Sequence, residues 1–303
     1  ISIADAMEKQ SGFLDLIVVL ILGVAAVALS RLLTQPYRNL AAMIDKVAEG
    51  NMETAAVEDT YLETQRISEA VNQTIGKLRA AEQSRQEFVS NVSHELKTPI
   101  TSIRVLADSL MSMEEAPVEL YQEFMKDISD EIDRESKIID DLLSLVKMDK
   151  SAAEMNITQV SINGLLELIL KRIRPIAKKR NVELILESIR EVSAEVDEVK
   201  LSLALNNLVE NAVKYNIEDG WVRVTLDADH KYFYIKVADS GIGIPEEFQD
   251  RIFERFYRVD KARSRETGGT GLGLAITKSV ILMHQGTIKL ESKEGEGTTF
   301  TVK

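Results

Sequence analysis

The chain has 303 residues, about twice the size of a typical single domain, so two or three domains are expected. Hydrophobic residues make up 45% and charged residues 28%, a balance that excludes wholesale disorder and a polytopic membrane protein. Because 49 acidic residues outnumber 37 basic ones and no cysteine is present, the composition disfavours nucleic acid as a partner and excludes disulfides and thiolate chemistry.

The first predicted element is a transmembrane helix at residues 13–33. Its sequence, FLDLIVVLILGVAAVALSRLL, is long enough to cross a hydrocarbon core of roughly 30 Å. A buried core helix seldom runs this far without polar residues. A cleaved signal peptide is disfavoured because Asp5 and Glu8 precede the apolar run, where a signal needs basic residues.

The charges beside the span predict its orientation. Arg31 and Arg38 follow it, so the positive-inside rule leaves residues 1–12 as an extracytoplasmic stub and places the rest in the cytoplasm. Since the chain begins at Ile1 rather than Met, we expect a fragment of a longer protein whose sensor domain is missing.

Residues 34–84 contain two short amphipathic stretches joined by a polar connector. Their apolar residues recur at spacings of three and four, which predicts a narrow coiled-coil seam that a parallel dimer would bury. The segment resembles a HAMP linker. The seam residues are Leu40, Ile44 and Val47, then Ile67, Val71, Ile75 and Leu78, and the resemblance also uses Pro36, Gly50, Glu63 and Asn72.

Residues 85–150 predict a helical hairpin with a turn near Pro117. One apolar stripe runs from Phe88 to Leu110 and another from Tyr121 to Val146. Two antiparallel helices of this length form half of a four-helix bundle, and a homodimer would supply the other half.

His94 lies off the apolar stripe of the first helix and is predicted to face solvent. An ordinary solvated histidine is the simplest interpretation, but Lys97 and Thr98 lie one turn later on the same face. Glu95 could hold the proton on Nδ1 and leave Nε2 as a nucleophile. Pro99 removes one helical hydrogen bond beside this site, so a bend is expected there.

The segment Ser93–Pro99 reads SHELKTP and resembles the phosphorylated motif of sensor histidine kinases of two-component signalling. The resemblance implies that His94 accepts a phosphoryl group. It also implies a phosphatase role for Thr98, spaced three residues after Glu95, whose hydroxyl would hold the attacking water. The alternative for Thr98 is a hydrogen bond to a backbone carbonyl one turn back.

Residues 151–303 predict an α+β sandwich in which one sheet lies under three helices. The expected helices are Ile162–Lys179, Val199–Tyr215 and Leu272–Met283, and the expected strands are Val182–Leu186, Trp221–Leu226, Tyr232–Val237, Thr287–Leu290 and Thr298–Val302.

Three motifs in this region predict a nucleotide site. Asn207 and Asn211 share a helix face, and their amide oxygens suit Mg²⁺ unless both are simply buried structural residues. The carboxylate of Asp239, in the motif DSGIG, could accept a hydrogen bond from an adenine amino group, although such glycines mostly mark turns. The glycine-rich run at residues 268–274 opens a helix that could cradle phosphates, and it matches neither a Rossmann turn nor a P-loop.

Together these blocks resemble the N box and glycine boxes of the histidine-kinase ATP-binding domain. The resemblance implies Mg²⁺ at Asn207 and Asn211, adenine at Asp239, and ATP contacts from the remaining box residues. These are Lys214, Tyr215, Gly241, Gly243, Gly269, Thr270, Gly271, Leu272, Gly273 and Thr298.

The segment from Pro245 to Thr270 is too long for an ordinary loop and is predicted to be a lid. Phe253 is expected in the core, whereas Phe256 and Tyr257 resemble the aromatic anchor of the lid. The arginines of the segment add the candidates Arg251 and Arg258, which would contact the nucleotide phosphates.

Related ATPases carry a water-activating glutamate where this chain has Asn207, so the resemblance implies transfer to His94 rather than hydrolysis of ATP. His230 and His284 are interpreted as structural or surface residues. A free ATPase and a dimeric pseudokinase scaffold are the alternatives, the first disfavoured by Asn207 and the second by the intact boxes.

The sequence thus predicts a membrane-anchored, homodimeric sensor histidine kinase in a bacterial plasma membrane. It would use ATP and Mg²⁺ and pass the phosphoryl group to an aspartate of a response regulator.

Overall fold

The computed structural model describes residues 3–48, 62–113, 117–150, 155–260 and 269–303. It divides into two units, one ending at Ser90 and the other beginning at Asn91.

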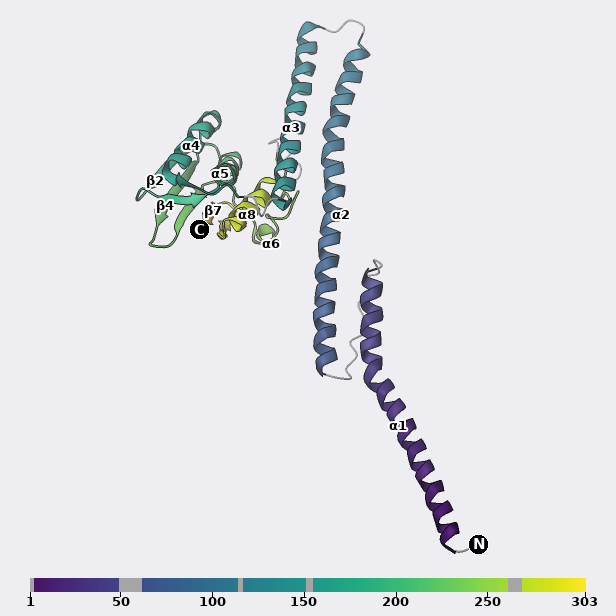
Figure 1. Ribbon diagram of the computed structural model, residues 1–303. Helices are drawn as coiled ribbons and strands as arrows, with labels where there is room; N and C mark the ends of the chain where they lie inside the picture. Colours follow the sequence, from purple (N-terminus) through teal and green to yellow (C-terminus); the bar gives the residue numbers. More distant parts are fainter. Residues whose placement is uncertain (1–2, 49–61, 114–116, 151–154, 261–268) are drawn as a thin grey trace. The chain divides into compact units, whose positions relative to one another are not determined.

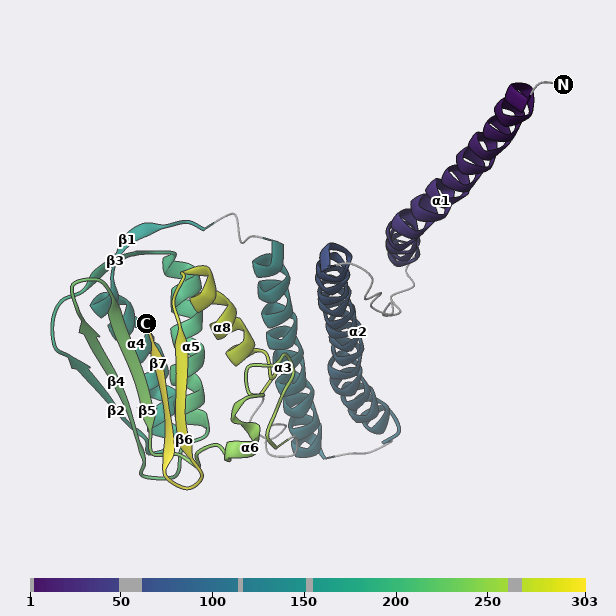
Figure 2. The same cartoon turned by 90° about the horizontal axis from the view of Figure 1, so that it is seen from below.

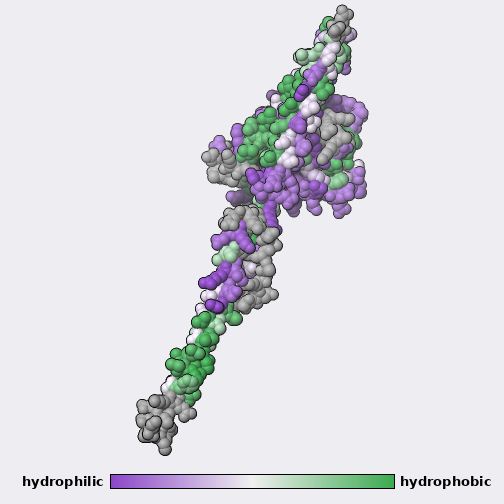
Figure 3. Space-filling model, turned by 90° about the vertical axis from the view of Figure 1, so that its right-hand side faces the viewer, coloured by the Kyte–Doolittle hydropathy of each residue, from purple (hydrophilic) through white to green (hydrophobic). Residues whose placement is uncertain are grey.

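The first unit contains α1 (Ile3–Ala48) and the beginning of α2 (Leu62–Met111). α1 includes one helix segment, Gly12–Val47, that is long and apolar enough to cross a membrane. Its most apolar 18-residue stretch has a mean hydropathy of 2.7, and none of that stretch is buried within the protein. Its apolar side chains form a continuous surface on the helix (Figure 3). The predicted span at residues 13–33 lies within this segment, and the helix continues through Pro36.

The HAMP prediction is only partly covered by the described residues. Gly50 and most of the connector lie outside them, whereas Ile75 of the second seam is fully buried. A HAMP fold therefore stays a prediction.

The helical part of the second unit is the predicted hairpin. α3 (Val118–Lys150) begins directly after Pro117 and runs antiparallel to α2 (Figure 1). α2 remains helical through Pro99, so the expected local loosening does not end the helix. Ile138 and Leu145 of α3 are buried.

The rest of this unit is built on a five-stranded sheet in the order β2-β4-β5-β7-β6. Its strands are β2 (Glu183–Ser188), β4 (Trp221–Ala228), β5 (Phe233–Asp239), β6 (Ile288–Lys293) and β7 (Gly297–Val302). β2 pairs with β4 in parallel, and the other neighbours are antiparallel. All five predicted strands are confirmed, with shifted ends.

Three helices lie on one side of this sheet (Figure 2), namely α4 (Ile162–Lys179), α5 (Glu198–Lys214) and α8 (Gly273–Met283). Val222, Val224 and Leu226, which alternate along β4, are completely buried, as are Leu205 and Leu208 of α5. The alternating apolar side chains of the strand and the apolar face of the helix therefore belong to one core. This arrangement confirms the predicted α+β sandwich.

A short antiparallel pair, β1 (Thr158–Ser161) and β3 (Ser193–Val196), was not predicted. Each strand has four residues, too few for alternation to stand out from the surrounding loop. Ser161 also caps α4, because its hydroxyl accepts a hydrogen bond from the amide of Gly164.

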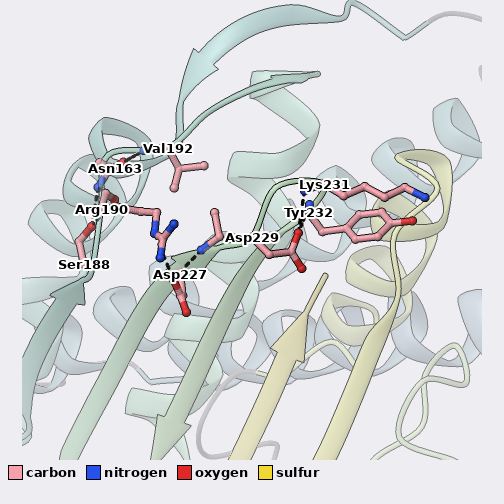
Figure 4. A network of polar contacts seen from close by, with 9 residues as sticks. Asn163, Ser188, Arg190, Val192, Asp227, Asp229, Lys231 and Tyr232 are labelled. Atoms are coloured by element: carbon pink, nitrogen blue, oxygen red, sulfur yellow. Dashed lines mark hydrogen bonds and ion pairs between the residues drawn. The ribbon is translucent and has the colours of Figure 1, made fainter.

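A polar network lies at the end of the sheet remote from Asp239, where it links α4, the loop after β2 and β4 (Figure 4). Asn163 on α4 donates to the hydroxyl of Ser188 at 2.6 Å and accepts from the amide of Val192 at 2.7 Å. Arg190 forms an ion pair with Asp227 at 3.4 Å. The network fastens the loop after β2 to α4 and β4, which is a structural role.

Candidate active site

A cavity of about 240 Å³ lies at the carboxyl end of β5. Twelve sequence-predicted nucleotide contacts line it. They are Asn207, Asn211, Lys214, Tyr215, Asp239, Gly243, Arg258, Gly269, Thr270, Gly271, Gly273 and Thr298. Residues far apart in the chain thus converge on one space, as the combined motifs predict.

Asp239 ends β5 and is buried in the wall of the cavity. Its Oδ1 accepts hydrogen bonds from the amides of Gly241, at 2.9 Å, and Thr298, at 3.3 Å. Burial nevertheless raises the pKa of Asp239 to about 6, because removal from water penalises the charged form more than these bonds favour it. The cavity therefore offers a fixed, poorly solvated carboxyl group, suited to reading a polar edge of a flat ring.

The amide of Asn207 is oriented by the loop that opens α8. Its Nδ2 donates to the carbonyl of Gly273 at 3.2 Å, which leaves Oδ1 as the atom able to face a cation. Asn211 lies one turn later on α5 and lines the same cavity. Two amide oxygens are hard ligands, so this pair fits Mg²⁺ brought in with a nucleotide.

Lys214, at the last turn of α5, lines the cavity and lies 5.3 Å from the ring centre of Tyr215. Burial, as the largest cause, and the positive charges of Lys137 and Arg258 together lower the pKa of Lys214 to about 8. A negatively charged ligand would oppose both effects and restore the ammonium form.

The glycine loop before α8 is closely packed. Gly271 has φ of +71°, and a Cβ there would lie 2.8 Å from the carbonyl carbon of Phe256. The Gly271 carbonyl accepts a hydrogen bond from the Phe256 amide at 2.9 Å. Because of the positive φ and this clash, only glycine allows the loop to lie so close to the backbone of the predicted lid.

Three predicted nucleotide contacts lie away from the cavity lining. Gly241 sits against the backbone of Tyr215 and supports Asp239 through its amide. Leu272 is completely buried, so its side chain belongs to the core. Arg251 is exposed, pairs with Glu254 and stacks on the ring of Tyr257.

The predicted lid is described at residues 245–260 and 269–270. It contains α6 (Glu246–Gln249) and then a series of turns. Phe253 packs edge to face on Phe300, as expected for a core residue. Phe256 is buried, whereas Tyr257 lines the cavity.

Arg258 reaches from this segment into the cavity and is nine-tenths buried. Its Nη2 donates to Oε2 of Glu95 at 2.5 Å and to the Thr270 carbonyl at 3.3 Å. Its Nε is buried with no hydrogen-bond partner among the described residues. An unsatisfied guanidinium donor at this place suits an anion.

His94 is exposed on α2, as predicted. The carboxylate of Glu95 bonds Arg258, so the structure does not show the predicted hydrogen bond to Nδ1 of His94. Thr98 donates its hydroxyl to the His94 carbonyl at 3.1 Å, which is the alternative considered for it. His284 is structural, since Nε2 accepts from the Asp197 amide and Nδ1 lies 2.8 Å from the Val280 carbonyl.

Sequence reasoning missed the contribution of α3 to the cavity. Lys137 and Asp141 line it, and Asp141 accepts a hydrogen bond from the Thr270 hydroxyl at 2.8 Å. Lys137 forms an ion pair with Glu210 of α5 at 2.6 Å. The only local signal is the spacing of four between two charged residues, which is common on solvated helices.

Residues 84–151 match the family model of the His Kinase A (phospho-acceptor) domain. Residues 196–303 match that of the histidine kinase-, DNA gyrase B- and HSP90-like ATPase.

Among similar proteins, the sensor histidine kinase WalK of Bacillus subtilis is 40% identical over 223 residues, covering 73% of this chain and 36% of WalK. The phosphate regulon sensor protein PhoR of Pseudomonas aeruginosa is 35% identical over 227 residues, covering 75% of this chain and 51% of PhoR. The chain thus spans about a third to a half of the length of these relatives.

The fold is shared with histidine kinase ThkA, solved in complex with response regulator protein TrrA. The TM-score is 0.59 at 24% identity, over 75% of this chain and 65% of ThkA. The phospho-acceptor and ATPase domains, in this order and around the cavity described above, place this chain in the family of two-component sensor histidine kinases.

Proposed function

We propose that the chain phosphorylates His94 from ATP and passes the phosphoryl group to an aspartate of a response regulator. The observation that carries this proposal is Arg258, which lines the nucleotide cavity and also bonds Glu95, the residue next to the exposed histidine. One side chain thus connects the donor site to the acceptor motif.

In the proposed reaction, Nε2 of neutral His94 attacks the γ-phosphorus of ATP. The bond from this phosphorus to the β–γ bridging oxygen breaks, and ADP leaves with that oxygen. The attack leaves a positive charge on the imidazole, which is neutralised when the Nδ1 proton passes to Glu95 or to water. If Glu95 is the acceptor, its carboxylate exchanges Arg258 for the histidine during the cycle.

The cavity residues divide into an adenine end and a phosphate end. Asp239 would accept from the adenine amino group, and Lys214, Arg258 and the glycine-loop amides would face the phosphates. Asn207 and Asn211 would hold Mg²⁺, which when bound neutralises part of the phosphate charge. Neither amide can act as a general base, which favours transfer to His94 over hydrolysis of ATP.

The proposal extends to the setting of the kinase. The apolar part of α1 would anchor a homodimer in a bacterial plasma membrane, with the catalytic residues in the cytoplasm. Support for a regulator partner comes from ThkA, a kinase of the same fold that was solved with TrrA.

The test is His94→Gln in the full chain, supplied with γ-labelled ATP. The variant should bind ATP like the parent and incorporate no acid-labile label, because acceptor and cavity are separate. Asn211→Ala should abolish labelling while His94 is intact. Label that persists in His94→Gln would overturn the assignment. A parent protein that binds ATP but takes up no label would also overturn it, because a pseudokinase scaffold behaves in this way.

We also propose that the chain dephosphorylates its regulator. Thr98 is exposed one turn after His94, and its hydroxyl donates a hydrogen bond to the His94 carbonyl. If the hydroxyl instead bonded a water molecule, it would hold that water at the acceptor site for attack on the phosphorylated regulator. Thr98→Ala should keep His94 labelling and lose dephosphorylation of the phosphorylated regulator. Equal loss of both activities, or of neither, would contradict this role.

A further inference from the structure

α3 of the hairpin forms one wall of the nucleotide cavity. Lys137 and Asp141 stand one turn apart on the face of α3 that meets the ATPase part of the chain, and both line the cavity. Asp141 accepts the hydroxyl hydrogen of Thr270 in the glycine loop, and Thr270 also accepts from the Leu272 amide at 3.2 Å. The glycine loop is thereby fastened to α3.

The described lining residues include three cations, Lys137, Lys214 and Arg258. Two of them are engaged or hindered within the protein, because Arg258 bonds Glu95 and burial lowers the pKa of Lys214. Lys137 also has a partner, Glu210, but its surroundings differ. It is half exposed, and its partner Glu210 is about one-third exposed, so their ion pair is solvated and contributes little stability.

We propose that Lys137 is a phosphate-binding residue of the nucleotide site, held there by the Asp141–Thr270 hydrogen bond, so that α3 completes the site of its own chain. The inference rests on the proposed function. A triphosphate carries several negative charges against the single charge of Glu210, so Lys137 would exchange its weak pair for the ligand. ATP affinity would then depend on the docking of the ATPase part on α3.

The experiment compares the ATP, ADP and adenosine affinities of the full chain, measured by displacement of a fluorescent nucleotide. Lys137→Met should weaken ATP about tenfold, the loss expected for one hydrogen bond to a charged group. ADP should lose less and adenosine nothing. Lys137→Arg should restore ATP binding, and Lys126→Met, an exposed α3 position outside the cavity, serves as the matched control.

Glu210→Gln separates phosphate binding from a purely structural role. If the ion pair only docks α3, then Glu210→Gln and Lys137→Met weaken binding alike, and adenosine suffers with ATP. If Lys137 binds phosphate, Glu210→Gln releases it and ATP binds as tightly as in the parent or up to a few-fold more tightly. Equal losses of ATP affinity in the two variants would overturn this inference. Unchanged ATP affinity in Lys137→Met would do the same, and if the parent still labels His94 the proposed function stands. A parent that binds no ATP would instead overturn the proposed function.

Discussion

Two carboxylates, Asp239 at the end of β5 and Asp229 in the turn between β4 and β5, respond in opposite ways to their surroundings. Burial raises the pKa of Asp239, whereas three donors, the amides of Lys231 and Tyr232 and the hydroxyl of Tyr234, hold the pKa of Asp229 at about 2. Asp229 closes a turn and is satisfied there. Asp239 is kept at a cost to folding, which is expected of a group retained for binding.

The first prediction concerns Asp239→Asn. Because the folded-state pKa of Asp239 is raised to about 6, its favourable contribution is complete below the unfolded pKa and is lost as pH rises through 6. The rise of the pKa from its ordinary value to about 6 corresponds to about 2–3 kcal/mol of unfolding free energy. The asparagine variant should therefore unfold with a larger free energy than the parent above pH 6, while ATP affinity falls at least tenfold.

The measurement is urea unfolding monitored by circular dichroism from pH 4 to 8, paired with nucleotide binding. Asp229→Asn is the control with the opposite sign, since a lowered pKa stabilises the fold above the unfolded pKa and its loss should destabilise it at pH 7. Asp239→Asn with unchanged ATP affinity would refute the adenine-reading role.

At the scale of elements, the glycine loop and the segment before it are fitted to each other through backbone atoms. We expect Gly271→Ala to lower ATP affinity and His94 labelling at least tenfold, because the new methyl group meets the Phe256 backbone and the position needs a positive φ. Gly295→Ala is the matched control. Its φ is +79° but nothing lies within 4 Å of the added Cβ, so strain occurs without a clash.

Both variants should be compared by ATP titration and by thermal unfolding of the full chain. A loss of ATP binding in Gly271→Ala with near-parental binding in Gly295→Ala would assign the effect to the loop contact. Equal losses would instead assign it to backbone strain in general.

Elements with a strong period were predictable, and contacts between them were not. The bounds of α4 follow from an apolar stripe preceded by a capping serine, and Ile162–Lys179 is correct at both ends. Asp239 and Asn207 lie in motifs whose neighbouring residues in the sequence are enough to predict a nucleotide-binding role. Lys137 and the Arg258–Glu95 pair carry no such pattern, because their partners lie 73 and 163 residues away and depend on how the domains dock.

At the scale of the whole molecule, α3 carries an apolar stripe that the described residues of its own chain leave about half exposed. Ile132, Ile139, Leu143 and Val146 are each between 43% and 51% exposed. Their spacings of seven, four and three residues keep them on one helix face, as in a coiled-coil seam. Such a stripe on a hairpin needs a partner, and a second copy of the hairpin would present the same surface.

The last prediction is that Ile139→Glu combined with Leu143→Glu weakens the dimer at least tenfold, because each carboxylate would have to be desolvated at the seam. Glu123→Lys, a charge change at an exposed α3 position on the opposite face, should leave the dimer intact. Light scattering of the detergent-solubilised full chain measures the oligomeric state. Since the cavity lining described here comes entirely from one chain, the monomeric variant should still bind ATP. A dimer that survives both glutamates would contradict the seam, and ATP binding lost together with the dimer would show that the partner completes the nucleotide site.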